Sequence, residues 1–73
     1  MEYKLKEIAA RIKELRNIFG YSTQEMAHKT NVSPEEYETL ENGEKDFSFT
    51  FIYKCALTFK VEVADIIEGE SPT

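Results

Sequence analysis

The sequence predicts an all-α fold in which four helices and a fifth apolar element form a single compact domain. Apolar residues recur at spacings of three and four in the first segment, and Ser-x-x-Glu pairs open two shorter segments. Only two prolines and three glycines interrupt the 73 residues, which favours helices over many short strands. A chain of this length has room for one hydrophobic core, and its 41% hydrophobic content is enough to fill that core.

A stripe of apolar side chains predicts a first helix of roughly four turns. The stripe consists of Leu5, Ile8, Ala9, Ile12, Leu15 and Phe19. Gly20 follows directly, at the position after a helix where a left-handed residue is favoured, so the helix is expected to end there. Much of the positive charge of the chain lies off this stripe, on Lys4, Lys6, Arg11 and Lys13.

Two capping boxes predict two short helices joined by a tight turn. Ser22 stands three residues before Glu25, and Ser33 stands three before Glu36, so each pair is expected to exchange side-chain and backbone hydrogen bonds. Pro34 fits the first helical position, where no N–H is needed. The helices are expected at about residues 23–30 and 34–41, with the turn at 31–32 and a stop at 42–43.

The rest of the chain predicts two further elements that close the core. Ser48 can cap a fourth helix, whose expected apolar face consists of Phe49, Ile52, Cys55, Ala56 and Phe59. The segment "VEVADII" is either a short fifth helix or an extended apolar stretch. The domain is expected to span residues 1–69, and residues 70–73 form a polar tail that is compatible with a further domain beyond it.

Composition excludes several classes of function. Nine bases against fourteen acids give a net charge of −5, which argues against strong nonspecific binding to nucleic acid and against docking on an anionic membrane. The single cysteine, Cys55, excludes an internal disulfide and fits a reducing compartment. We find no secretion signal and no apolar run long enough to span a membrane, so we expect a cytoplasmic protein.

The sequence offers no catalytic or metal-binding constellation. It contains no Ser/His/Asp or Cys/His set and no glycine-rich phosphate loop. His28 is the only histidine and has no spaced partner, so no metal site is expected, and Cys55 is expected to be a small buried side chain. We therefore expect a protein that is not an enzyme and that carries no cofactor.

Two short capped helices with a tight turn between them suggest a helix-turn-helix motif at about residues 23–42. The chain resembles the Cro/repressor-type family, also called the xenobiotic-response-element family, from about Ile8 to Ile67. The residues that carry the resemblance are "IAARIKELRNIFGYSTQEMA", "VS" at the exit of the turn, "LENG" after the third helix and the spacing to "VEVADII". The resemblance implies a five-helix, lambda-repressor-like fold whose third helix enters the major groove of DNA, and it implies an ion pair between Arg16 and Glu41.

The resemblance also gives the candidate DNA-binding residues. On a helical period, Glu35, Glu38, Thr39 and Asn42 share the side of the third helix opposite Tyr37 and Leu40. Ser and Thr hydroxyls and the Asn amide can bind phosphates or base edges, and glutamate can accept a hydrogen bond from cytosine N4. The full candidate set is Thr23, Gln24, Ser33, Pro34, Glu35, Glu38, Thr39, Asn42 and Lys45.

The acids on the third helix leave two functions open. The first is sequence-specific binding of double-stranded DNA by a transcriptional regulator, with affinity supplied by a homodimer or a second domain. The second is a helix-turn-helix fold reused for protein–protein contact, in which the acidic third helix meets a basic protein partner. The position of five bases should discriminate between them, because bases beside the third helix would offset its acids: Arg11, Lys13, Lys29, Lys45 and Lys60.

Overall fold

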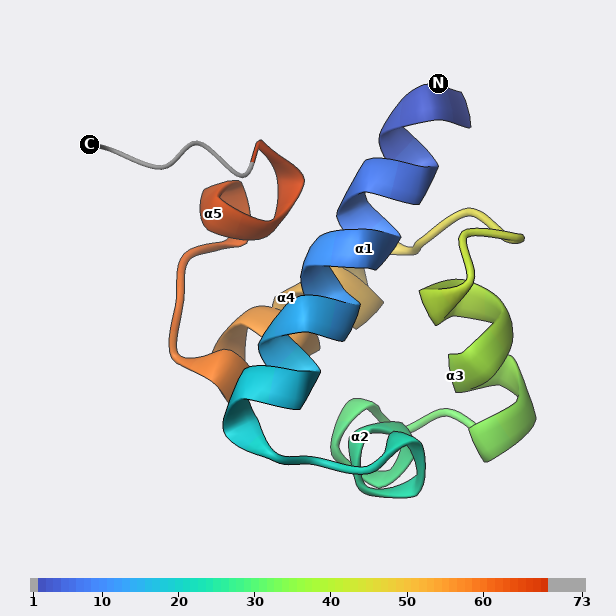
Figure 1. Cartoon of the computed structure of the whole chain (residues 1–73), viewed down its shortest axis with the longest axis vertical. Helices are drawn as coiled ribbons and strands as arrows, with labels where there is room; N and C mark the ends of the chain where they lie inside the picture. The colour runs from blue at the N-terminus through green and yellow to red at the C-terminus, as the bar shows by residue number, and fades with distance from the viewer. Residues whose placement is uncertain (1, 69–73) are drawn as a thin grey trace.

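The computed structural model describes residues 2–68, and within that range it contains five α-helices and no strand (Figure 1). The helices are α1 (Glu2–Phe19), α2 (Thr23–Thr30), α3 (Pro34–Glu41), α4 (Phe49–Phe59) and α5 (Val63–Ile67). The predicted all-α class and the five-helix arrangement are therefore confirmed, and the alternative left open for "VEVADII" resolves as a short helix. The tail predicted for residues 70–73 lies outside the described residues.

Helix α1 is the longest helix and crosses the whole molecule (Figure 1). It packs against α3, α4 and α5, while α2 packs against α3 and α4. In the view of Figure 1, α3 stands on the right, α5 on the left, α2 at the bottom and α4 behind α1. The two helices of the motif, α2 and α3, are thus held on the side of α1 away from α5. No helix among the described residues is long and apolar enough to cross a membrane.

Every helix contributes a side chain to the core. The largest of the fully buried side chains come from all five helices: Ile12, Met26, Tyr37, Cys55, Phe59 and Ile66. In the motif, Met26, Thr30, Tyr37 and Leu40 are buried, and the partly buried Val32 packs against the core. The core therefore fixes α2 and α3 through one face of each helix and leaves the opposite faces free.

The first predicted capping box is complete and the second is not. Ser22 Oγ accepts from the Glu25 N–H at 3.0 Å, and Glu25 Oε1 accepts from the Ser22 N–H at 2.8 Å. Ser33 Oγ accepts from the Glu36 N–H at 3.1 Å, but the Glu36 carboxylate binds Lys45 Nζ at 3.1 Å instead of returning to Ser33. The prediction that the Glu36 carboxylate accepts from the Ser33 N–H is therefore wrong. The loop after α3 brings Lys45 within reach of this carboxylate, and the carboxylate binds Lys45 instead.

The apolar face predicted for α4 also needs a correction. Phe49 is 67% exposed, whereas Phe51 is buried and its ring lies 6.0 Å from that of Tyr37 and 5.7 Å from that of Phe47. Ser48 caps the helix at the Phe51 N–H as expected, but the aromatic that turns inward is Phe51 and not Phe49. Phe19, predicted on the α1 stripe, is 41% exposed and covers the edge of the core, with its ring 5.4 Å from that of Phe59.

The turns adopt the conformations expected of their residues. Gly20 and Gly43, which follow α1 and α3, have φ of +75° and +74°. Asn31, between α2 and α3, has φ of 63°, and the N–H of the next residue, Val32, donates to the carbonyl of Ala27 at 3.0 Å. Left-handed glycine and asparagine are the least strained choices at these positions. The turn between α2 and α3 is therefore short and closed by backbone hydrogen bonds.

Candidate functional site

The outer face of α3 is presented to solvent along its whole length. Tyr37, Leu40 and Glu41 point inward and are buried. Thr39 is half-buried, and the exposed positions on this side include most of the predicted site: Ser33, Pro34, Glu35, Glu38 and Asn42. The structure therefore brings the α3 candidates onto one continuous surface.

The remaining candidates come from neighbouring segments. Thr23, which is half-buried, and Gln24, which is exposed, occupy the first turn of α2. Lys45 lies in the loop after α3 and reaches back to Glu36. That loop also meets the start of α1: Lys6 and Lys45 line one shallow depression together with Leu5, Gly43, Glu44 and Asp46. Lys6 was not among the predicted site residues, because its local sequence does not show that the start of α1 packs beside the loop after α3.

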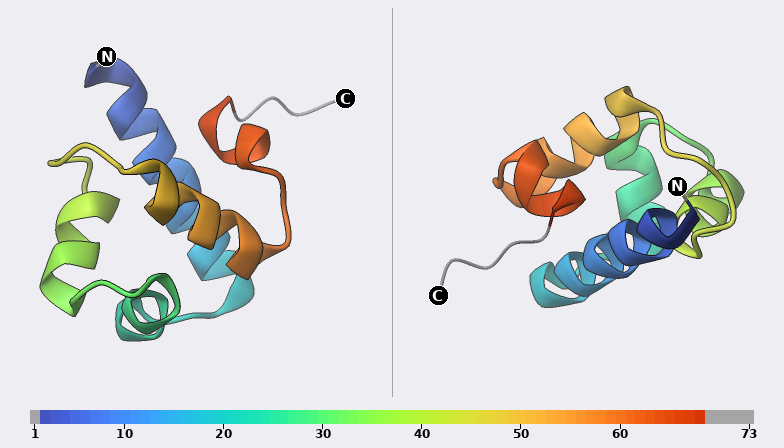
Figure 2. Two further views of the ribbon diagram at one scale, coloured as in Figure 1. Left: turned by 180° about the vertical axis from the view of Figure 1, so that it is seen from behind. Right: turned by 90° about the horizontal axis from the view of Figure 1, so that it is seen from above.

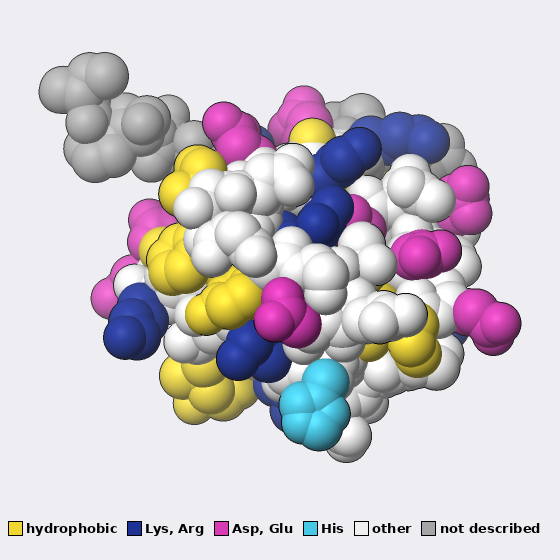
Figure 3. Space-filling model, turned by 60° about the horizontal axis from the view of Figure 1, so that its bottom comes forward, with side chains coloured by type: hydrophobic (Ala, Val, Ile, Leu, Met, Phe, Trp, Pro, Cys, Tyr) yellow, Lys and Arg dark blue, Asp and Glu magenta, His cyan; other side chains and the backbone are white. Residues whose placement is uncertain are grey.

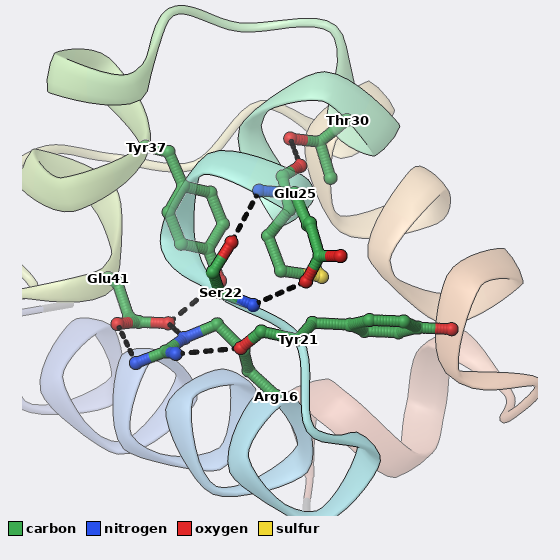
Figure 4. A network of polar contacts seen from close by, with 8 residues as sticks. Arg16, Tyr21, Ser22, Glu25, Thr30, Tyr37 and Glu41 are labelled. Atoms are coloured by element: carbon green, nitrogen blue, oxygen red, sulfur yellow. Dashed lines mark hydrogen bonds and ion pairs between the residues drawn. The ribbon is translucent and has the colours of Figure 1, made fainter.

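A buried polar network sets the position of α3 (Figure 4). Arg16 on α1 binds Glu41 on α3 through two hydrogen bonds, Nε to Oε2 at 2.7 Å and Nη2 to Oε1 at 3.2 Å. This is the pair that the family resemblance implies. Tyr37, one helical turn before Glu41, donates its hydroxyl to the same Oε2 at 2.7 Å. The buried carboxylate thus receives three donors, as a charge removed from water requires.

The same network reaches the start of α2. Arg16 Nη1 donates to the carbonyl oxygen of Tyr21 at 3.0 Å, in the segment that leads into the Ser22 cap (Figure 4). One guanidinium group therefore joins α1, the entry to α2 and the end of α3. Its five N–H donors in a planar fork suit this task, and a lysine at this position would supply a single point of contact. Both helices of the motif are held relative to α1 by this side chain.

Ionisation of the network follows from its burial. Hydrogen bonding to Glu41 raises the pKa of Arg16, so the guanidinium stays charged. Burial raises the pKa of Tyr37 well above its usual value, and the hydrogen bond to Glu41 raises it further. Tyr37 therefore remains a neutral donor. Its part in the network was missed by the sequence analysis, although the spacing of four residues between Tyr37 and Glu41 places the two side chains on one helix face.

Few bases lie beside α3. Lys45 is paired with Glu36 at 3.1 Å, and among the side chains that the structure describes, those of residues 5–68, no base lies within ion-pair distance of Glu35 or Glu38. Arg11 donates to the carbonyls of Ile66 and Ile67 at the end of α5. The others also lie elsewhere: Lys13 on the outer side of α1 beside Ile18, Lys29 over the Tyr21 ring and Lys60 at the end of α4.

The five bases that were to discriminate between the two functions thus do not gather at α3, apart from Lys45. Figure 3 shows one face of the molecule, on which acidic and basic side chains are both spread over the surface and several acidic side chains lie along the right-hand edge. The site is a helix N-terminus and an outer helix face with a local excess of negative charge. Among the described residues, no group of three or more His, Cys, Asp or Glu is placed to hold a metal ion.

The arrangement of α2 and α3 is shared with solved regulators. The structure of the clp gene regulator ClgR from Corynebacterium glutamicum superposes with a TM-score of 0.83 at 25% identity, covering 89% of this chain and 69% of that chain. A second ClgR structure gives 0.80 at 25% identity, covering 89% and 84%. The restriction-modification controller protein C.AhdI from Aeromonas hydrophila shares the fold, with a TM-score of 0.81 at 23% identity over 88% of this chain and 97% of its own.

Family comparison agrees with the structural one. Among curated proteins, none matches the chain. The helix-turn-helix domain family matches residues 9–72, which include all of α2 to α5 and most of α1. The chain therefore belongs to the helix-turn-helix domain family, and it is of the Cro/repressor type that its sequence resembles.

Proposed function

We propose that this domain binds double-stranded DNA in a sequence-specific manner as part of a transcriptional regulator, with α3 in the major groove. The observation that carries the proposal is the presentation of α3: its inner face is fixed by Tyr37, Leu40 and Glu41, and its outer face is free. An α-helix of this kind fits the major groove of B-DNA. The solved ClgR structures, which are those of a gene regulator, support the same assignment by their likeness to this chain.

Each candidate residue has a role in this proposal. Ser33 and Pro34 enter the groove first, and Glu35 and Glu38 face base edges, where a carboxylate accepts from cytosine N4. Thr39 donates its hydroxyl to the Glu35 carbonyl at 3.0 Å, so it faces the DNA as an acceptor. Phosphates are bound from the flanks of α3 by Thr23, Gln24, Asn42 and Lys45.

The charge of α3 limits affinity. Glu35 and Glu38 are exposed and have no basic partner among the described side chains of residues 5–68, so they repel phosphates as the helix approaches. Glu35, which lies in the first turn of α3, stabilises the helix itself by about 0.3–1 kcal/mol, without removing that repulsion. One domain is therefore expected to bind weakly. Useful affinity arises when a homodimer or a second domain places two motifs on half-sites about 34 Å apart.

Titration with mixed-sequence duplex DNA tests the proposal. Binding should be measurable at low salt and should weaken as salt rises, because released counterions supply much of the free energy of binding. The double variant Glu35→Gln/Glu38→Gln should bind mixed duplexes more tightly than the parent. Glu14→Gln, on the exposed side of α1, is the matched control and should leave affinity unchanged. Absence of binding at low salt, or binding that ignores salt, contradicts DNA recognition.

A second function is favoured by the same two carboxylates. A helix face that carries exposed Glu35 and Glu38 suits a basic protein segment, in which lysine side chains would bind these two carboxylates. The double variant separates the two functions because it acts on them with opposite sign. It should strengthen binding to duplex DNA if α3 is a DNA reader. If α3 is instead a protein-binding helix, the variant should weaken binding to a lysine-rich peptide, and DNA should not bind the parent protein at low salt.

A further inference from the structure

The centre of the outer face of α3 offers hydrogen-bond acceptors. Seen from behind, α3 stands at the edge of the molecule, with the other helices to one side of it (Figure 2, left). Glu35 and Glu38 are exposed there, and a carboxylate accepts hydrogen bonds without donating any. Thr39 lies beside them and donates its hydroxyl to the Glu35 carbonyl at 3.0 Å, so its oxygen is left with lone pairs only. All three side chains can therefore receive a proton donor from a ligand.

The donors nearest to this centre lie at the ends of α3 or are engaged by another group. Ser33 precedes the helix and Asn42 follows it, so their hydroxyl and amide groups flank the two glutamates. Lys45 Nζ binds the Glu36 carboxylate at 3.1 Å. Among the described side chains of residues 5–68, no base pairs with Glu35 or Glu38. The middle of the reading face is thus built from acceptors.

An acceptor-only face discriminates strongly among the four bases. In the major groove only two groups donate, the N4 amino group of cytosine and the N6 amino group of adenine. Guanine presents the acceptors N7 and O6, and thymine presents O4, so both repel a carboxylate. Adenine carries the acceptor N7 beside its amino group. Cytosine is the one base whose edge combines a donor with no acceptor, and it is therefore the base that this face favours.

We propose that this face reads cytosines whose N4 amino group carries no methyl group, and that methylation of N4 blocks the binding of this domain. This specificity rests on the proposed function, since it requires α3 to lie in the major groove. In a duplex, one amino hydrogen of cytosine pairs with guanine and the other points into the major groove. A methyl group on N4 replaces that second hydrogen, so the carboxylate loses its donor and meets an apolar group. A methyl group on C5 leaves both amino hydrogens in place.

The spacing of the two glutamates predicts the spacing of the cytosines. Glu35 and Glu38 are three residues apart on one helix, so their Cβ atoms are separated by about 5–6 Å. Successive base pairs of B-DNA are about 3.4 Å apart, so this separation falls between one and two base-pair steps. Each half-site should therefore contain two cytosines that are adjacent or separated by one base pair.

Selection from random duplexes, followed by chemical modification of the selected site, tests the proposal. The full chain is used at low salt, and the enriched duplexes should contain the predicted pair of cytosines. The site is then synthesised in three forms, in which every cytosine is unmodified, N4-methylated or C5-methylated. The N4-methylated duplex should bind at least about tenfold more weakly than the unmodified one, because two base contacts are lost. The C5-methylated duplex keeps the donors and should bind within about twofold of the unmodified one.

Two double variants show whether the glutamates cause the difference. Glu35→Ala/Glu38→Ala removes both carboxylates and should reduce the difference between the unmodified and N4-methylated duplexes to less than about threefold. Glu14→Ala/Glu68→Ala is the matched control, since it removes the same charge from two exposed positions on α1 and at the end of α5. This control should keep the difference of the parent. Because each variant is compared on the same duplexes, a general change in affinity or in duplex stability cancels. Equal helicity by circular dichroism shows that the variants fold.

The outcomes separate this specificity from DNA binding itself. Three results overturn the reading of cytosine amino groups while DNA binding stands: enriched sites without the pair of cytosines, equal losses from N4 and C5 methylation, or a difference that persists in Glu35→Ala/Glu38→Ala. If the parent binds no duplex at low salt, the proposed function is wrong, and the proposed specificity is wrong with it. Binding that weakens on N4 methylation alone, and only while both glutamates are present, supports the proposal.

Discussion

Tyr37 and Arg16 share one acceptor: both donate to Oε2 of Glu41, each at 2.7 Å. The two donors come from different helices, and the acceptor closes the last turn of α3. Helix α3 is thus fixed at its C-terminal end by a charged group in the protein interior, while its N-terminal end is fixed by the Ser33 cap. A charge in this position is tolerated because its partners replace the water it has lost.

Removal of the Tyr37 hydroxyl should lower the free energy of unfolding by about 1.5–3 kcal/mol, the range for a hydrogen bond to a charged group. The variant is Tyr37→Phe, measured by urea denaturation. Tyr53→Phe is the control, since this tyrosine is 48% exposed, and it should change stability by less than about 0.5 kcal/mol. Equal effects from both variants would show that the hydroxyl of Tyr37 is not engaged in the folded protein.

Stability should fall at alkaline pH. Burial raises the pKa of Cys55 from 9.0 to about 12 and raises that of Tyr37 above its ordinary 10.0. Above about pH 9 the unfolded chain therefore loses protons that the folded protein keeps, and the free energy of unfolding decreases by about 1.4 kcal/mol per pH unit for each such group. Below the unfolded pKa values both states hold these protons, so this stabilisation is fully present at neutral pH.

Urea denaturation at pH values between about 7 and 11 measures that decrease. Cys55→Ala removes one of the two groups and should make the alkaline decrease shallower. It should also cost about 1 kcal/mol at neutral pH through lost packing, so the slope and not the absolute value is the readout. If the free energy of unfolding of Cys55→Ala falls with pH as steeply as that of the parent, the Cys55 thiol does not contribute to the alkaline loss of stability.

Lys60→Gly should stabilise the protein. Lys60 follows α4 in the left-handed region, with φ of 59°, where an L side chain is strained by about 1–2 kcal/mol and glycine is not. The expected gain in the free energy of unfolding is about 1 kcal/mol, because glycine also loses more entropy on folding. Asn31→Gly, at φ of 63°, is the control and should gain less, since asparagine tolerates this conformation. A loss of stability in Lys60→Gly would indicate that its side chain contributes packing.

Lys45→Ala should reduce the salt dependence of DNA binding. In the proposed function Lys45 contacts a phosphate, so its removal should lower the slope of log K against log salt by about one. It also frees Glu36, which it binds at 3.1 Å, and adds to the negative charge beside α3. Lys13→Ala, on the outer side of α1, is the control and should leave the slope unaltered. Equal slopes in both variants would place Lys45 outside the contact.

Much of the fold could be predicted because short-range chemistry determines it. Ser22, Ser33 and Ser48 each cap a helix where the sequence places one, and Gly20 and Gly43 end helices in the left-handed region. These signals act over three or four residues, so no knowledge of the rest of the chain is needed to interpret them. The spacing of buried positions on α2 and α3 is predictable for the same reason.

The predictions fail where contacts with a segment distant in the sequence determine which side chain is buried or bound. Phe49 and Phe51 are both aromatic and near the start of α4, and the one that is buried is the one that meets Tyr37 and Phe47. Glu36 leaves its expected cap because the loop after α3 returns Lys45 to it. The position of the bases relative to α3, on which the function depends, is likewise set by the rotation of α1 and α4 about their axes, which sequence spacing does not specify.

The contact between Arg11 and α5 can form only late in the synthesis of the chain. Arg11 lies on the first helix, but its Nη1 donates to the carbonyls of Ile66 and Ile67, 55 and 56 residues further along the chain. Ile66 is fully buried, so the core stays open on that side until the last helix arrives. A nascent chain that still holds α5 inside the ribosome can form α2 and α3 but cannot cover α1 completely. The hydrophobic core around the motif is therefore completed only after nearly all of these residues have emerged.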